Sequence, residues 1–112
     1  MNKEIGKLLV NVTEIEGTLT IFLSGSFIFQ AHRDFKAAYQ EALEKAAVSH
    51  IVVDFANVEY LDSSALGMLL VLKDKVEKAQ KALTLTRPNL VTVQTFEIAG
   101  FDKIFKITAK LA

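Results

Sequence analysis

The chain has 112 residues, no cysteine, 51% hydrophobic residues and equal numbers of basic and acidic side chains, 13 of each. This length suits one domain, residues 1–112, and the apolar fraction is too high for a disordered chain. Zero net charge argues against nucleic acid as the main partner, because neutralising phosphates needs a basic excess. The lack of cysteine excludes disulfides and thiolate chemistry and fits a cytoplasmic location. No stretch approaches the roughly 18 apolar residues of a membrane span, so no membrane association is expected.

The first half of the chain predicts a hairpin followed by a helix. Residues 8–15 alternate loosely between apolar and polar side chains, and residues 18–23 are rich in β-branched types, with a turn at Gly17 between them. Both segments are predicted strands, the first at a sheet edge. Apolar residues then recur at helical spacing over 35–46, which predicts an amphipathic helix with His32 in its first turn.

The second half predicts alternating strands and helices. The apolar run 51–53 is typical of a strand buried on both faces, with His50 at its start as a surface or edge residue. The remaining predicted elements are a helix from about Ser64 that turns charged over 73–81, a strand over 82–86, a helix from Pro88 to about Ala99 ended by Gly100, and a strand over 104–108. The order ββαβαβαβ predicts an α/β domain, a mixed sheet of about four to five strands with helices packed against it.

Asp62, Ser63 and Ser64 stand directly before the second predicted helix. Asp and Ser cap helix N-termini because their side-chain oxygens accept hydrogen bonds from first-turn amides. Such a terminus also favours negative charge, so a serine there is a plausible phosphate acceptor. On spacing alone the capping role is the favoured interpretation, and a phosphorylation switch is the alternative.

The D-S-S-A-L-G segment from Asp62 to Gly67 resembles the STAS family, in particular the bacterial anti-sigma factor antagonists. The similarity extends over nearly the whole chain, through Leu23-Ser24-Gly25, Asp54 at the end of the preceding strand, and the apolar pattern 96–105. The resemblance implies that the kinase partner, itself the anti-sigma factor, phosphorylates Ser63, with Ser64 as second choice. Unphosphorylated, the domain would bind the anti-sigma factor and free the sigma factor for transcription. A serine phosphatase would restore that state.

The resemblance also implies a surface for the partner, expected at Asp62, Ser63, Ser64, Ala65, Gly67, Ser26, Phe27 and Ile28. Two positions depart from the family. Ala65 stands where many members have Gly, and Ile28 stands where the antagonists often carry Asp. We therefore expect the partner to offer an apolar contact to Ile28. A monomer is expected, and a dimer is the alternative.

Catalysis by the chain is not expected. A nucleophilic serine would need a base, for which the sequence offers only His32 and His50, and the G-x-S-x-G nucleophile motif is lacking. The two histidines and the scattered carboxylates form no recognisable metal set either. No phosphate-binding loop motif is present either, so neither a metal nor a cofactor is expected. Phe27 and Phe29 are interpreted as core residues, with an exposed docking patch as the alternative.

Two other roles remain open. One is a STAS subunit of a lipid-transport ABC complex, acting against an ATPase. The other is a receiver-like domain phosphorylated on Asp, which ranks well behind because no acidic pair follows the first strand.

Overall fold

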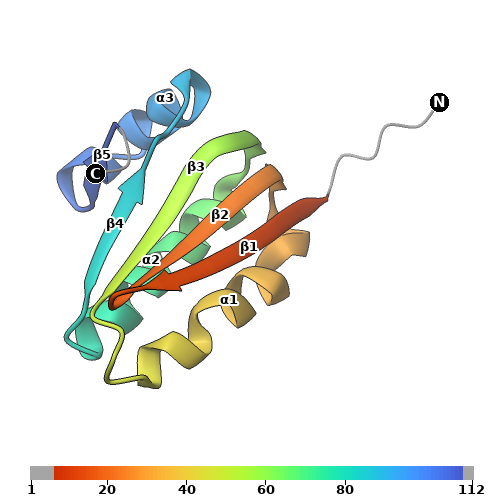
Figure 1. The fold of residues 1–112 in the computed structure, drawn as a ribbon. Helices are drawn as coiled ribbons and strands as arrows, with labels where there is room; N and C mark the ends of the chain where they lie inside the picture. Colours follow the sequence, from red (N-terminus) through yellow and green to blue (C-terminus); the bar gives the residue numbers. More distant parts are fainter. Residues whose placement is uncertain (1–6, 110–112) are drawn as a thin grey trace.

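A β-hairpin begins the fold in the computed structural model, which describes residues 7–109. β1 (Leu8–Ile15) pairs antiparallel with β2 (Thr18–Phe27). The next strands are β3 (His50–Leu61), β4 (Ala82–Thr86) and β5 (Lys106–Thr108), each parallel to the strand before it in the sheet. The strand order β1-β2-β3-β4-β5 confirms the predicted mixed sheet and places β1 at an edge (Figure 1).

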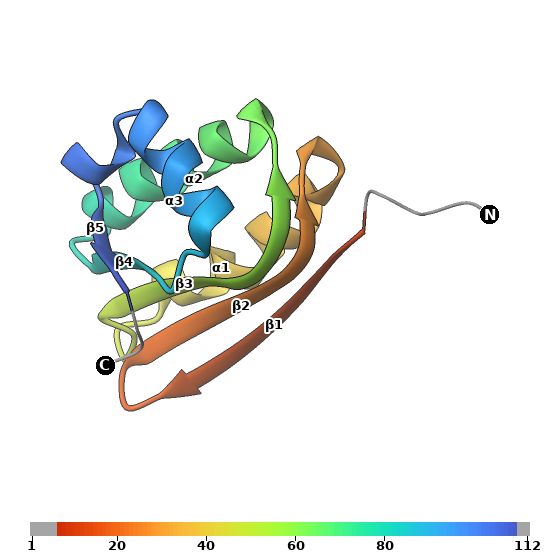
Figure 2. The same cartoon turned by 90° about the horizontal axis from the view of Figure 1, so that it is seen from above.

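Three helices cover one side of this curved sheet (Figure 2). They are α1 (His32–Glu44), α2 (Ser63–Lys78) and α3 (Leu90–Ile98). Two short 3-10 helices, η1 (Phe29–Ala31) and η2 (Phe101–Lys103), precede α1 and follow α3. The element order confirms the predicted ββαβαβαβ arrangement. In the described part of the chain, no helix lies on the other side of the sheet.

Aromatic side chains form a continuous line through the core. Phe27 contacts Phe35 of α1, with ring centroids 4.9 Å apart, and also Phe55 of β3. Phe55 meets Phe96 of α3 edge-on at 5.2 Å, and the line continues through Phe101 to Phe105. Burying each ring contributes about 1.5–3 kcal/mol. This line fixes α1 and α3 on the same side of the sheet.

Two strands are longer than the sequence predicted. β2 continues past Leu23 to Phe27, and β3 continues to Leu61 through the segment interpreted as a polar link. The two extensions pair with each other, so backbone hydrogen bonding outweighs the polar side chains there. β5 is shorter than predicted because the backbone N–H groups of Ile104 and Phe105 donate to the Phe101 carbonyl, so these two residues continue the turn of η2 and do not join the strand. Ala46 was expected in the first helix, but it is exposed and lies beyond the end of α1.

The start of α3 also differs from the prediction. Asn89 is its N-cap: the side-chain oxygen accepts from the Thr92 N–H at 3.0 Å, and the amide nitrogen donates to the Val58 carbonyl. Pro88 therefore precedes the helix instead of occupying its first turn. At the other end Gly100 has φ +75°, which confirms the predicted glycine after the helix.

A glycine bends β2 just before it reaches α1. Gly25 has φ +108°, and a Cβ there would lie 2.5 Å from the Lys7 carbonyl oxygen, so only glycine fits. The register between β2 and β3 shifts at Gly25 and Ser26. This bulge sets the direction in which the chain leaves the sheet toward Ile28 and Phe29.

Candidate functional site

Asp62 joins two segments that are distant in sequence. Its Oδ1 accepts a hydrogen bond from the Ala65 N–H at 3.0 Å, which makes it the N-cap of α2. Its Oδ2 accepts from the Phe29 N–H at 3.4 Å, and its own backbone N–H donates to the Phe27 carbonyl. One carboxylate therefore holds the loop after β2 against the start of α2. The sequence indicated the cap but not the bond to Phe29.

The two candidate serines differ in environment. Ser63 is the first residue of α2 and is exposed to solvent, whereas Ser64 is half-buried and faces α1. They are separated by about 100° around the helix axis. The first N–H groups of a helix have no acceptor within the helix, and the Asp62 carboxylate accepts a hydrogen bond from one of them, that of Ala65. A phosphate on Ser63 would therefore lie at a helix N-terminus and in solvent.

The loop after β2 lies beside this helix start. Ile28 is half-buried and directly precedes Phe29, the residue whose N–H reaches Asp62. The Phe29 ring is 64% exposed and stacks on His32, with centroids 6.3 Å apart and planes at 14°. The expectation of core placement is confirmed for Phe27 and is wrong for Phe29. The reason is the end of β2, after which the chain turns outward into η1.

The expected docking surface is narrower in the structure than the sequence indicates. Phe27 and Ala65 are fully buried, and Ser26 is only 8% exposed. Phe27 belongs to the aromatic core line, and Ala65 lies on the face of α2 that meets the sheet. Ser26 and Ala65 are therefore corrected from surface to interior positions, and for Phe27 the core interpretation holds and its place on the docking surface is wrong. Accessible to a partner are Asp62, Ser63, Ser64, Gly67 and Ile28, which we call the helix-start surface.

Gly67 has no steric role in the described fold. A Cβ added there would have no neighbouring atom within 4 Å. Glycine within a helix costs about 1 kcal/mol relative to alanine. Alanine would fit at this position, yet α2 carries the less stabilising Gly67 there, one turn from Ser63 and Ser64. A bare patch of helix backbone at this point suits close approach by another molecule.

A pocket of about 400 Å³ opens beside the same helix start, between α1 and α2. We call it the helix-pair pocket; its lining comprises Phe29, His32, Phe35, Lys36, Tyr39, Ser64, Gly67, Met68, Val71 and Lys75. The sequence predicted no pocket here. The only available signal was the helical spacing of His32, Lys36 and Tyr39, which puts them on one side of α1.

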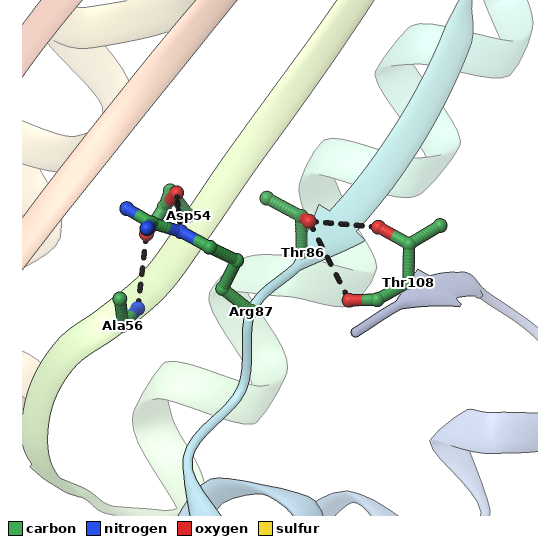
Figure 3. A network of polar contacts seen from close by, with 5 residues as sticks. All are labelled: Asp54, Ala56, Thr86, Arg87 and Thr108. Atoms are coloured by element: carbon green, nitrogen blue, oxygen red, sulfur yellow. Dashed lines mark hydrogen bonds and ion pairs between the residues drawn. The ribbon is translucent and has the colours of Figure 1, made fainter. Parts of the chain in front are cut away.

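Asp54 belongs to a separate polar network (Figure 3). Because β3 continues to Leu61, Asp54 lies within the strand and not at its end as predicted. Its carboxylate is buried, accepting from the Ala56 N–H at 2.9 Å and from Arg87 Nε at 2.8 Å. The Arg87 cation offsets the cost of burying this charge. We interpret Asp54 as a structural residue.

His50 lies at the start of β3 as predicted, but β3 is the central strand, so of the two predicted positions, surface or edge, the edge is wrong. It is half-buried, and its Nε2 lies 2.8 Å from Thr84 Oγ1. Burial, and secondarily the charge of Lys106, lowers the pKa of the imidazole below its usual value. The neutral ring serves as a hydrogen-bonding group between neighbouring strands.

Within residues 7–109 the structure contains no group of three or more His, Cys, Asp or Glu side chains arranged to hold a metal ion. In the same residues no helix has the length and apolar character needed to cross a membrane.

The chain is similar to known proteins in its sequence and in its fold. The STAS domain family model matches residues 10–112. A STAS-domain containing protein of Pseudomonas aeruginosa is 44% identical over 94 residues, covering 80% of this chain and 87% of the relative. The anti-sigma F factor antagonist of Paenibacillus polymyxa is 23% identical, over 89% of this chain and 86% of its own.

A solved structure shows the same fold. An anti-sigma factor antagonist from Mycobacterium paratuberculosis superposes with a TM-score of 0.82 at 20% sequence identity, over 94% of this chain and 88% of that one. The family match and the 44% identical relative together settle the classification. The chain belongs to the STAS domain family.

Proposed function

We propose that the chain is an anti-sigma factor antagonist that works by partner switching. Unphosphorylated, it binds an anti-sigma factor through the helix-start surface and so frees a sigma factor. Phosphorylation of Ser63 by that partner ends the binding, and a phosphatase restores it. In this role the chain is the substrate of both enzymes. Relatives named as anti-sigma factor antagonists support the proposal at the level of the family.

The observation that carries the proposal is the position of Ser63. Asp62 forms the cap, and the neighbouring Ser63 is exposed on the first turn, where its hydroxyl has no hydrogen-bond partner within residues 7–109. Gly67 leaves the helix surface bare one turn further on. A partner can approach closely here while the core remains undisturbed.

The physical effect of phosphorylation follows from charge. A phosphate adds about −1.5 to −2 charges and three acceptor oxygens. Asp62 already places a carboxylate beside Ser63, so the modified surface concentrates negative charge at one point. The helix N-terminus offsets part of this charge within the domain. A partner surface that fits the bare hydroxyl would face both a clash and an unpaired charge, and would dissociate without a change of fold.

The test begins with a pull-down from the source organism, using wild-type protein and the variants Ser63→Asp and Ser63→Ala as baits. We expect wild type and Ser63→Ala to retain a kinase-related partner that Ser63→Asp loses. The recovered kinase is then used for phosphopeptide mapping, where Ser64→Ala retains phosphorylation and Ser63→Ala abolishes it. A phosphate found only on Ser64 would overturn the choice of Ser63. Recovery of a transporter ATPase in place of a kinase would favour the lipid-transport role.

A further inference from the structure

The helix-pair pocket has the size and lining of a small-molecule site. Its volume of about 400 Å³ lies within the range of about 300–1,000 Å³ typical of ligand pockets. Aromatic and aliphatic side chains from both helices form most of its wall, among them Phe29, Phe35, Tyr39, Met68 and Val71. An apolar ligand body would contact carbon on both sides.

The charges at this pocket are all positive or neutral. Lys36 from α1 and Lys75 from α2 line it, both half-buried, and no acidic side chain does so among the described residues. The four ion pairs found within residues 7–109 use other cations, namely those of Lys45, Lys73, Lys78 and Arg87.

Tyr39 adds no negative charge to the pocket. Burial raises the pKa of its phenol, which keeps it neutral at physiological pH. The Lys75 ammonium lies 5.9 Å from the centre of the Tyr39 ring, over the wall of the pocket. Two cations without a carboxylate partner in the described structure thus border an apolar cavity, and the complementary ligand is apolar with one anionic end.

We propose that the helix-pair pocket binds a small amphipathic carboxylate, with its apolar body between α1 and α2 and its carboxylate toward Lys36 and Lys75. Ser64 and Gly67 also line the pocket, so a bound ligand would cover part of the helix-start surface. The ligand and the anti-sigma factor would therefore compete for this surface. Only this competition rests on the proposed function; the binding of the ligand to the pocket is independent of it.

The test uses naphthalene-2-carboxylate and its neutral isostere naphthalene-2-carboxamide as probes. Each is titrated into ¹⁵N-labelled wild-type protein and followed by amide chemical shifts. We expect the carboxylate to bind at least about threefold more tightly than the amide, with the shifts concentrated in residues 29–39 and 64–75, as suits a charge contact at a half-exposed site. Lys36→Gln and Lys75→Gln should each remove this preference. Lys78→Gln, the same change on an exposed lysine of α2 outside the pocket, should leave it intact.

Each contrary result has a definite meaning. Equal affinity for the two probes would refute the charge complementarity, and shifts concentrated elsewhere would refute the site. Binding of neither probe, together with loss of the anti-sigma factor in Lys36→Gln/Lys75→Gln, would overturn the ligand proposal and assign the pocket to the partner. Tight carboxylate binding without any effect on the partner would leave the ligand site standing and refute only the competition.

Discussion

Replacing Asp62 with alanine tests how the candidate site is held together. The substitution removes the cap of α2, which is worth about 1 kcal/mol. It also removes the acceptor of the Phe29 N–H, whose long 3.4 Å bond adds about 0.5 kcal/mol. We therefore expect the free energy of unfolding to fall by about 1.5 kcal/mol. For a domain of this size that loss corresponds to a decrease in Tm of about 6 °C.

The measurement is urea unfolding followed by far-UV circular dichroism, since the chain has no tryptophan to report on its folding by fluorescence. With a slope of about 2 kcal/mol/M, the midpoint should shift down by about 0.75 M and the slope should not change. The matched control is Asp62→Asn, which keeps a side-chain oxygen as cap and should lose only a few tenths of a kcal/mol. An Asp62→Ala midpoint within about 0.15 M of wild type would refute the capping account.

Three further substitutions test other parts of the account. Gly67→Ala should raise the free energy of unfolding by about 0.5–1 kcal/mol, because a methyl group fits there. The same methyl group would cover the bare helix backbone, so partner binding should weaken at least about threefold. An unchanged affinity in calorimetry would contradict the role given to this bare patch of helix. Ile28→Asp should weaken binding to the native partner, since the new carboxylate would be desolvated against an apolar contact. Ile28→Val, which keeps an apolar side chain, is the control. If Ile28→Asp binds the partner more tightly than Ile28→Val does, the position is a degraded family site and not an apolar contact. Arg87→Met should destabilise the fold by about 2 kcal/mol by leaving the buried Asp54 carboxylate unpaired, and Asp54→Asn in the same chain should recover part of this loss in chemical denaturation.

The sequence predicted the order of elements and most strand starts well, because apolar periodicity and turn residues are local signals. β1 and β4 match their predicted bounds, 8–15 and 82–86. The extensions of β2 and β3 could not be predicted in this way. They depend on pairing between strands about 30 residues apart, and their polar side chains look like a loop in isolation.

The candidate site was predicted in part. A helix cap among Asp62, Ser63 and Ser64 was predicted from residue type and position, and the structure gives that role to Asp62, with Ser63 as the exposed first residue of α2. The burial of Ser26 and Ala65 does not follow from residue type and position, since it depends on how the end of β2 and α2 lie in the fold. The bond from the Phe29 N–H to Asp62 likewise needs the fold, because it joins residues 33 positions apart.

The central claim is that one phosphate on Ser63 switches the binding of an anti-sigma factor. Its most direct test is an isothermal titration of the recovered partner with two forms of the protein, unmodified and phosphorylated on Ser63 alone, together with a thermal melt of each form. The account predicts that phosphorylation weakens binding at least about tenfold, or about 1.4 kcal/mol, while Tm barely changes. Equal affinity of the two forms, or a loss of affinity that accompanies a large fall in Tm, would contradict it.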